Sequence, residues 1–365
     1  MDNFIYSQPV KIYFGEGCFE KLGDILTEQG INSAVIACGK HFAPEARELI
    51  DTIPQIKAYF GEVEPNPQLS GIEKTAELAK EFSADAVIGI GGGSSIDTAK
   101  FAAAIAKGEG AALEYYHGEK TWPDTRLKII AVPTTAGTGS EVTQVSVVSN
   151  GTEKRTINNP VFMPTVAVVD PVLSSTVPPR TTMCTGLDAM AHALEGYWSR
   201  NHQPISDLMA IEAVRLILEN LEAAYTDGGN MAARANMAYA SLLGGLSFAL
   251  PKTAASHACS YPLSEDYHLP HGEACAFTLD SFVRINADER LEYLAKRAGL
   301  DGTGELAEKI HELKKLAGLK MTLSELGEVD LNKLCHDCAV HGLMNNNPVK
   351  MTEEMLKAMF LAMEA

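Results

Sequence analysis

The 365-residue sequence lacks the features of a nucleic-acid-binding, membrane-spanning or secreted protein. Acidic residues outnumber basic ones. The resulting formal net charge of −17 argues against nucleic acid or an anionic membrane as a partner. No apolar run reaches the roughly 18 residues that a membrane-spanning helix needs. The opening stretch MDNFIYSQPV has no signal-peptide pattern. With 46% hydrophobic residues the chain can bury large cores, and its length favours two domains.

Cysteine follows no disulfide pattern. The seven cysteines, an odd number, are scattered along the chain, which favours reduced thiols and hence a cytoplasmic protein. The segment CHDCAVH (335–341) would need a second ligand pair at similar spacing to form a structural zinc site, and none follows. We interpret its cysteines as embedded in a helix, with a metal or redox site as the alternative.

The first half of the chain alternates β-rich runs with amphipathic stretches. Residues 71–82 and 95–106 have helical spacing, and the opening segment 3–17 alternates as a strand or a hairpin would. The predicted strands are residues 33–38, 55–60, 85–90, 128–133 and 165–170. Such alternation predicts a parallel sheet covered by helices on both faces.

After VPPRTT (177–182) the pattern changes to i, i+3, i+4 apolar spacing, and β-branched runs disappear. The stretches with this spacing are residues 206–225, 230–250, 289–300 and 352–365. We therefore predict an α/β domain over residues 1–179 and an all-helical domain over residues 180–365.

Two glycine-rich loops follow predicted strands. In GIGGGSSIDTAK (89–100), residues 91–93 let the backbone approach a ligand, and Ser94 or Ser95 can cap a helix whose N-terminus suits a pyrophosphate. Because Ser94 replaces the third glycine, this is not the G-x-G-x-x-G fingerprint. The second loop, PTTAGTGSEVT (133–143), offers hydroxyls and bare backbone. One such turn is often purely structural, but two in one α/β domain predict a nucleotide site.

The strand end in VIACGKH (35–41) bears on the choice of cofactor. A carboxylate at such a strand end usually binds the adenosine ribose. Here Gly39 takes its place and Lys40 follows, which would tolerate a 2′-phosphate. The alternative is that Lys40 is merely solvated, and the choice between NAD and NADP stays open.

Two further segments carry potential metal ligands. TGLDAMAHALEGYW (185–198) places Asp188 and His192 four residues apart, on one face of a helix. Alone, such a pair is more often a surface hydrogen bond. The segment SHACSYPLSEDYHLPHGEACA (256–276) adds three histidines within the same helical domain. Three imidazoles and a carboxylate suit Fe²⁺, Zn²⁺ or a similar divalent ion.

Taken together, these blocks resemble the iron-containing, or group III, alcohol dehydrogenases over nearly the whole chain. The matching blocks are GIGGGSSIDTAK, PTTAGTGSEVT, VAVVDP, GLDAMAHALEGYWS, PHGEACA and NNNPVKMTEEML, in family order. The resemblance implies an N-terminal dinucleotide-binding domain and an all-helical metal domain, as in dehydroquinate-synthase-like proteins. It also implies NAD(P)-linked reduction of aldehydes or oxidation of primary alcohols, with Fe²⁺ favoured over Zn²⁺, and a homodimer.

The resemblance assigns roles residue by residue. The implied metal ligands are Asp188, His192, His257 and His271. The implied cofactor-binding residues are Gly91, Gly92, Gly93, Ser94, Ser95, Asp97, Thr134, Thr135, Thr138 and Lys154, with Gly39 at the ribose. His268 is not at a ligand position, and we interpret it as a neighbour of the site or a bystander.

Two departures from the family concern the substrate. Many members have a histidine with a proton-relay role where this chain has Tyr261, and a phenol takes up a proton less readily at neutral pH. Tyr261 would then orient the substrate. Lys252 stands where small or amide residues are common, and the surrounding pattern is more similar to relatives that reduce sulfonate- or phosphonate-bearing aldehydes. Lys252 would bind that anion; the alternative is a solvated lysine.

The expected reaction is hydride transfer between the nicotinamide and a small aldehyde such as sulfoacetaldehyde or phosphonoacetaldehyde, with the ion polarising the carbonyl. One alternative is a maleylacetate-type reductase or a glycerol-type dehydrogenase. Another is a sugar-phosphate cyclase, a lyase that recycles its cofactor. A nucleotide-binding module without activity would have no use for four metal ligands. The natural substrate, the physiological direction and the metal stay open.

Overall fold

The structure is a computed structural model that describes residues 3–40, 44–151 and 153–364. The chain divides into two compact units. The α/β unit comprises Ser7–Thr135 and Gly139–Thr176, and the helical unit contains Ala136–Thr138 and the chain from Val177 onward. His41, the last residue of the VIACGKH segment, lies outside the described residues.

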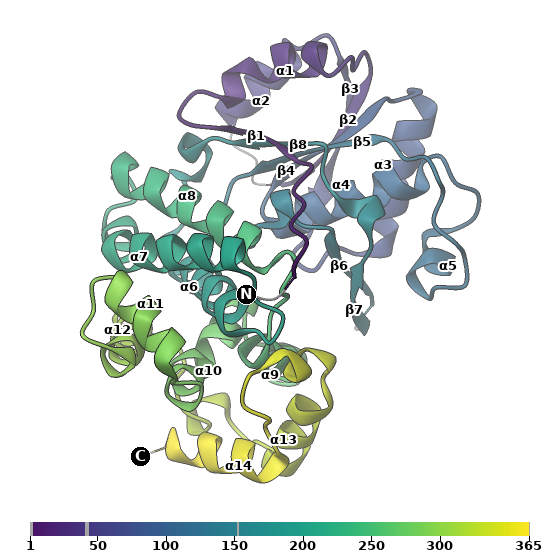
Figure 1. The fold of residues 1–365 in the computed structure, drawn as a ribbon. Helices are drawn as coiled ribbons and strands as arrows, with labels where there is room; N and C mark the ends of the chain where they lie inside the picture. Colours follow the sequence, from purple (N-terminus) through teal and green to yellow (C-terminus); the bar gives the residue numbers. More distant parts are fainter. Residues whose placement is uncertain (1–2, 41–43, 152, 365) are drawn as a thin grey trace. The chain divides into compact units, whose positions relative to one another are not determined.

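The α/β unit is built on a six-stranded parallel sheet of order β1-β8-β5-β4-β2-β3 (Figure 1). Its strands are β1 (Lys11–Phe14), β2 (Ala34–Gly39), β3 (Ile56–Val63), β4 (Ala86–Gly91), β5 (Lys128–Pro133) and β8 (Val166–Val169). The helices of this unit are α1 (Leu22–Glu28), α2 (Pro44–Asp51), α3 (Leu69–Glu81), α4 (Gly93–Ile105) and α5 (Ala112–Tyr116). The predicted parallel sheet is confirmed.

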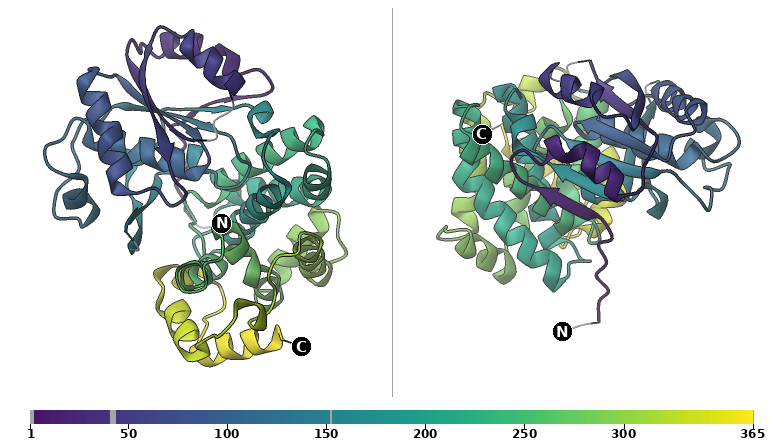
Figure 2. Two further views of the ribbon diagram at one scale, coloured as in Figure 1. Left: turned by 180° about the vertical axis from the view of Figure 1, so that it is seen from behind. Right: turned by 90° about the horizontal axis from the view of Figure 1, so that it is seen from above.

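Both faces of this sheet are buried. Along β2, Val35 and Ala37 pack into an apolar cluster with α3 and α4, whereas Ile36 and Cys38 pack into a second cluster with α1 and α2. Figure 2 shows these helix pairs on opposite sides of the strands. Successive side chains of a strand point to opposite faces, so a strand covered on both sides must be apolar at every position.

One expectation for this unit was wrong, and one was met by the first of its two alternatives. The opening segment forms a strand, β1, which pairs in parallel with β8, and not a hairpin within the described residues. Neither Ser94 nor Ser95 caps α4, because the helix begins at Gly93 with Gly92 as its N-cap. The sequence analysis also missed an antiparallel hairpin formed by β6 (Val145–Asn150) and β7 (Glu153–Asn158).

The helical unit begins with a proline-led helix. Pro178 cannot continue a preceding helix, and Pro179 occupies the first turn of α6, where no backbone donor is needed. The helices of this unit are α6 (Pro179–Trp198), α7 (Pro204–Thr226), α8 (Met231–Phe248), α9 (Ala255–Glu265), α10 (His271–Ile285), α11 (Glu289–Arg297), α12 (Thr303–Leu316), α13 (Leu331–Val340) and α14 (Glu353–Ala362). Cys335 and Cys338 lie buried within α13, as expected.

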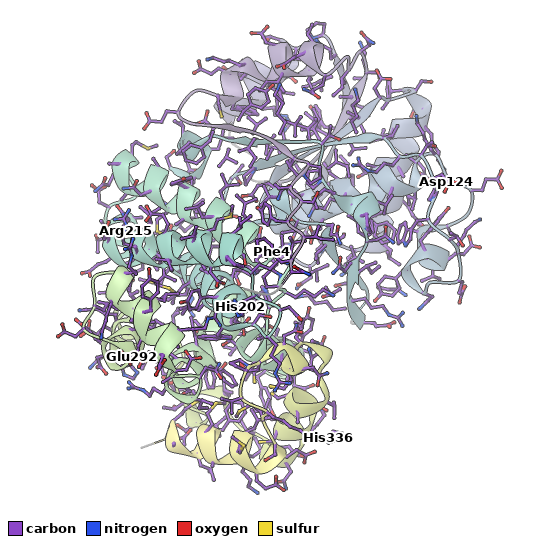
Figure 3. The ribbon with its side chains drawn as sticks, in the orientation of Figure 1. Phe4, Asp124, His202, Arg215, Glu292 and His336 are labelled. Atoms are coloured by element: carbon purple, nitrogen blue, oxygen red, sulfur yellow. The ribbon has the colours of Figure 1, made fainter. Side chains whose placement is uncertain are left out.

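The spacing of apolar residues along these helices determines which side chains are buried in the core and which face solvent. On α7, Val214 and Ile217 are buried in the core of the unit. Arg215 projects from the same helix and forms ion pairs with Glu212 and Glu219, one turn away on either side (Figure 3). Among the described residues, no helix has the length and apolar character needed to cross a membrane.

Candidate functional site

One face of α6 carries three buried polar side chains. Asp188, His192 and Glu195 follow one another at intervals of four and three residues, so they point to the same side of the helix. Burying this many polar groups is costly unless each finds a partner. Their partners come from α9 and α10.

Glu195 fixes the start of α9. The N-cap of this helix, Ala254, has no side chain that could accept a hydrogen bond. Glu195 Oε1 does so instead, accepting from the backbone N–H of Ser256 at 2.5 Å and of His257 at 3.3 Å. Its other oxygen accepts from His257 Nδ1 at 2.5 Å. One buried carboxylate therefore caps the helix and orients the imidazole that the helix carries.

A glycine brings His271 to the same place. His271 is the first residue of α10, and Gly272 follows it. A Cβ at Gly272 would lie 2.2 Å from the carbonyl oxygen of Cys184 on α6, so only glycine allows this close approach. The first turn of α10 thus packs against α6 next to Asp188.

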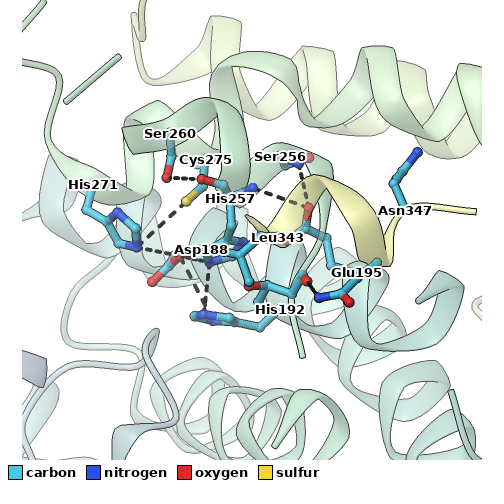
Figure 4. Close-up of polar contacts among 12 residues, drawn as sticks. Asp188, His192, Glu195, Ser256, His257, Ser260, His271, Cys275, Leu343 and Asn347 are labelled. Carbon is cyan, nitrogen blue, oxygen red and sulfur yellow. Dashed lines mark hydrogen bonds and ion pairs between the residues drawn. The ribbon is translucent and has the colours of Figure 1, made fainter. Parts of the chain in front are cut away.

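The donor atoms of these residues converge (Figure 4). His192 Nε2 lies 3.1 Å from His257 Nε2. Asp188 Oδ1 lies 3.6 Å from His257 Nε2 and 3.9 Å from His271 Nε2. The fold therefore gathers Asp188, His192, His257 and His271, which come from three different helices.

Hydrogen bonds on the outer side of two rings determine their tautomers. His192 Nδ1 lies 3.2 Å from the carbonyl oxygen of Gly137, and His257 Nδ1 lies next to the Glu195 carboxylate. Both partners can only accept, so both Nδ1 atoms must carry the hydrogen. In the neutral rings each Nε2 then has a lone pair that faces the centre of the cluster, which is the usual arrangement of a metal-binding histidine.

The electrostatics of the cluster favour a cation at its centre. Burial lowers the pKa of His192 to about 4, so this imidazole is neutral at physiological pH. Burial alone would also lower the pKa of His257, but the Cys275 and Glu195 side chains raise it well above its ordinary value. The surroundings of His257 Nε2 thus stabilise a positive charge.

The residues present fit a divalent ion. Among the described residues, none donates a hydrogen bond to Asp188 Oδ1, although this atom is buried. An unsatisfied buried acceptor costs about 1–3 kcal/mol, and more when it is charged. A cation would satisfy this oxygen and separate the two facing lone pairs. Nitrogen and oxygen donors of this kind suit Fe²⁺ or Zn²⁺.

Two residues that the sequence analysis placed near the substrate lie in different surroundings. Tyr261 is on α9, one turn after His257, and its ring stacks on that of His341 with centroids 4.4 Å apart. His268 is exposed in the turn between α9 and α10, with a left-handed φ of 57°. The roles of both residues toward the substrate remain predictions.

Lys252 lies between two helices and not within one. α8 ends at Phe248 and α9 begins only at Ala255, where Glu195 supplies the cap. Lys252 is exposed in the connecting turn, has a left-handed φ of 67° and donates its N–H to the carbonyl oxygen of Phe248 at 2.7 Å. This conformation costs a residue with a side chain roughly 1–2 kcal/mol and normally favours glycine, so the lysine is unexpected here.

In the α/β unit, the two glycine-rich loops meet. Thr134 donates its N–H to the carbonyl oxygen of Gly91 at 2.9 Å. Gly91 has a φ of 147°, and a Cβ there would lie 2.4 Å from Ser95 Oγ, so a side chain is excluded. Gly92 is the N-cap of α4 and faces Thr135. The free N–H groups of this helix start can receive a phosphate.

A buried network joins α4 to the second loop. Lys100 Nζ donates to Ser140 Oγ at 2.7 Å, and that hydroxyl donates to Asp97 Oδ1 at 2.7 Å. Asp97 Oδ2 accepts from the backbone N–H of Val147 at 2.8 Å. Asp97 therefore holds the loop in place, which differs from the ligand-facing position that the resemblance implied. Of the other implied residues, Lys154 lies on β7, and Thr138 belongs to the helical unit.

Comparisons with known proteins agree with this site. The family model described as iron-containing alcohol dehydrogenase matches residues 9–171, and the model of the C-terminal part of the same family matches residues 182–363. A long-chain-alcohol dehydrogenase from Geobacillus thermodenitrificans is 35% identical over 83% of this chain and 81% of its own. A sulfoacetaldehyde reductase from Bilophila wadsworthia is 33% identical over 83% of each chain.

A solved structure extends the likeness to the entire fold. The sulfoacetaldehyde reductase from Bifidobacterium kashiwanohense, in complex with NAD⁺, superposes with a TM-score of 0.96 over the full length of both chains, at 38% sequence identity. This chain belongs to the iron-containing alcohol dehydrogenase family. It is an oxidoreductase that interconverts alcohols and aldehydes.

Three residues of these sites were missed, although the sequence carries a signal for two. Glu195 follows His192 at a spacing of three residues on the same helix face. Cys275 follows His271 at a spacing of four. Lys100 is fully buried in α4. Its spacing gave no such signal, because its partners Ser140 and Val145 lie 40 and 45 residues further along the chain.

Proposed function

We propose that this protein reduces a small aldehyde bearing a sulfonate or phosphonate, using NAD(H) or NADP(H) and one bound divalent ion. The observation that carries the proposal is the unsatisfied Asp188 oxygen, which has the Nε2 atoms of His257 and His271 at 3.6 and 3.9 Å, with His192 Nε2 next to that of His257. Two sulfoacetaldehyde reductases among the similar proteins support the substrate class. A bound NAD⁺ in one of them supports the nicotinamide cofactor.

We propose Asp188, His192, His257 and His271 as the ligands of the ion, Fe²⁺ in preference to Zn²⁺. When bound, the ion would act as a Lewis acid on the aldehyde oxygen. The protein's own contribution is orientation. Glu195 and the Gly137 carbonyl hold the His257 and His192 rings in one tautomer, so binding the ion needs little rearrangement.

The proposed cofactor site lies at the two glycine-rich loops of the α/β unit. The N–H groups at the start of α4 would bind the pyrophosphate, with Gly91, Gly92, Gly93, Ser94 and Ser95 around it. Thr134 and Thr135 offer hydroxyls beside it, and Thr138, Lys154 and Gly39 are proposed contacts further along the cofactor. The nicotinamide supplies the hydride chemistry, and the protein binds and orients it.

On the substrate side we propose Lys252 as the partner of the anionic group and Tyr261 as a hydrogen-bond donor to the substrate, with His268 as a more distant neighbour. The left-handed backbone of Lys252 supports a functional role, since a lysine in a strained turn gives up stability that glycine would retain. Tyr261 is held by its stacking on His341.

A nicotinamide oxidation assay with matched substrates tests the proposal. Purified protein, reconstituted with Fe²⁺ or Zn²⁺, is supplied with NADH or NADPH and with sulfoacetaldehyde, phosphonoacetaldehyde or propanal. We expect one equivalent of reduced cofactor to be consumed for each aldehyde reduced, with the anionic aldehydes preferred. Turnover of a sugar phosphate without net cofactor consumption would instead identify a cyclase, and activity only on maleylacetate or glycerol would identify the other relatives.

We further propose a cytoplasmic homodimer in which residues 1–179 bind the cofactor and residues 180–365 carry the metal. The cytoplasmic location is supported by the seven cysteines, all of which are free. The dimer is supported by β1, an edge strand of the sheet that can pair with a second copy. Sedimentation of the purified protein would reveal a monomer if this is wrong.

A further inference from the structure

Cys275 lies among the proposed metal ligands without having been assigned a role. It is fully buried on α10, one helical turn after His271 and on the same face. Its Sγ atom is 3.8 Å from His271 Nε2. Figure 4 marks this contact with His271, and Cys275 also interacts with the His257 side chain.

The spacing of these atoms matches a coordination sphere. Asp188, His257, His271 and Cys275 each offer one donor atom, and the four atoms lie within 4.8 Å of one another. Around a zinc ion with bonds of about 2.0–2.3 Å, neighbouring donors are about 3–4 Å apart, and these four donors together with His192 would make a five-coordinate site. The separations between Asp188 Oδ1, the two imidazole nitrogens and the sulfur are close to this range.

The buried oxygen of Asp188 also favours a cation in this cluster. Asp188 Oδ1 is buried and receives no hydrogen bond from the described residues. A sulfur atom beside a carboxylate oxygen of this kind offers it no strong donor, since a thiol is a weak one. A positive ion is the group that both atoms would bind.

We propose that Cys275 is a ligand of the bound ion, so that the metal centre has a sulfur donor in addition to oxygen and nitrogen. This inference rests on the proposed metal centre. On binding, the sulfur–metal bond forms, the thiol proton leaves to solvent, and no electron is transferred. The thiolate and the Asp188 carboxylate together neutralise a divalent ion.

The chemical consequence is selectivity among metals. Thiolate is a soft ligand that favours Zn²⁺ and Fe²⁺, whereas Mg²⁺ and Mn²⁺ prefer oxygen. A site with Cys275 should therefore discriminate against the hard ions more strongly than a site built only from histidine and aspartate. It should also be a weaker Lewis acid, because the second negative ligand lowers its net positive charge.

X-ray absorption of the zinc-loaded, substrate-free protein tests the inference directly. We expect a sulfur scatterer at about 2.3 Å from zinc in the wild-type protein and its loss in Cys275→Ala. Cys335→Ala removes another buried cysteine of the helical unit and should keep the sulfur signal. Cys275→Ala should also lower the affinity ratio of Zn²⁺ over Mn²⁺ by at least roughly tenfold.

The outcomes separate the two proposals. One bound zinc with only nitrogen and oxygen neighbours in the wild type would overturn the role of Cys275 and leave the metal centre intact. A sulfur signal that survives in Cys275→Ala would overturn it as well. Failure of the wild-type protein to bind zinc or iron would overturn the metal centre itself. If Cys275→Ala does not fold, the wild-type spectrum alone still decides.

Discussion

His192 and His257 face each other through their Nε2 atoms at 3.1 Å, while the Nδ1 atom of each ring is held by an acceptor, Gly137 or Glu195. The raised pKa of His257 favours a proton on its Nε2, which donates to the Nε2 of the neutral His192. A metal ion between the two rings would replace this proton, accept both lone pairs and also satisfy the buried Asp188 oxygen.

Removing one of these imidazoles should release the ion. We expect His257→Ala to lose most bound metal and to reduce turnover by at least roughly 100-fold, because the variant lacks both the ligand and the ring that Glu195 orients. Metal analysis and an activity assay measure this. His268→Ala, at an exposed histidine in the next turn, should keep its metal. Full metal occupancy in the His257 variant would contradict the assignment.

The cofactor loop can be tested at Gly92. Its φ of −73° suits any residue, so Gly92→Val should act by occupying the approach path to the start of α4 and not by straining the backbone. We expect affinity for NADH and NADPH to fall by roughly 10- to 100-fold, or about 1.4–2.8 kcal/mol. Calorimetric titration measures it. Gly304→Val, where an added Cβ meets nothing within 4 Å, is the matched control. Unchanged affinity in Gly92→Val would move the site elsewhere.

Gly39 ends β2, and an acid placed there should discriminate between the cofactors. We expect Gly39→Asp to raise preference for NADH over NADPH by roughly tenfold or more, because a carboxylate would repel the 2′-phosphate. A Cβ at this position lies 3.4 Å from the carbonyl oxygen of Val63, so Gly39→Ala controls for the added bulk. Ratios of kcat/KM for the two cofactors decide the matter. An unchanged ratio in Gly39→Asp would show that another strand end holds the ribose.

Lys252 should matter only for charged substrates. We expect Lys252→Ala to lower kcat/KM for sulfoacetaldehyde by up to about fivefold, the range for losing an exposed ion pair, and to spare propanal. Lys252→Gly removes the same charge and relieves the left-handed backbone, so it should show the same selective loss with higher thermal stability. Equal losses for both aldehydes would indicate structural damage, and no loss for either would make Lys252 a solvated residue.

Glu141 should make stability depend on pH. Burial raises its pKa to about 7 from 4.5, so the folded protein prefers the protonated form. Below pH 4.5 both folded and unfolded states are protonated and the effect vanishes; as pH rises to 7 the folded state loses stability, by up to about 3 kcal/mol. Glu141→Gln should abolish this loss in urea unfolding measured across the window. The exposed variant Glu119→Gln should follow the wild type, and parallel curves for Glu141→Gln would refute the prediction.

The local patterns of the sequence were sufficient for most strands of the parallel sheet and for two of the proposed metal ligands. Alternating apolar runs determined β2, β4 and β5, because a strand buried on both faces must be apolar throughout. The spacing of Asp188 and His192 determined their common face, because a helix repeats every 3.6 residues. The resemblance to a family then extended the ligand set to His257 and His271.

The contacts between residues distant in sequence were decided only by the tertiary structure. The approach of α10 to α6 at Gly272 brings Cys275 into the cluster. The carboxylate of Glu195, about 60 residues earlier in the chain, caps the start of α9, so Lys252 lies in the turn before this helix. No periodicity encodes these relations, since they depend on which helix surfaces pack together and how closely. The helices follow from local spacing, whereas the proposed donor set follows from how the helices pack.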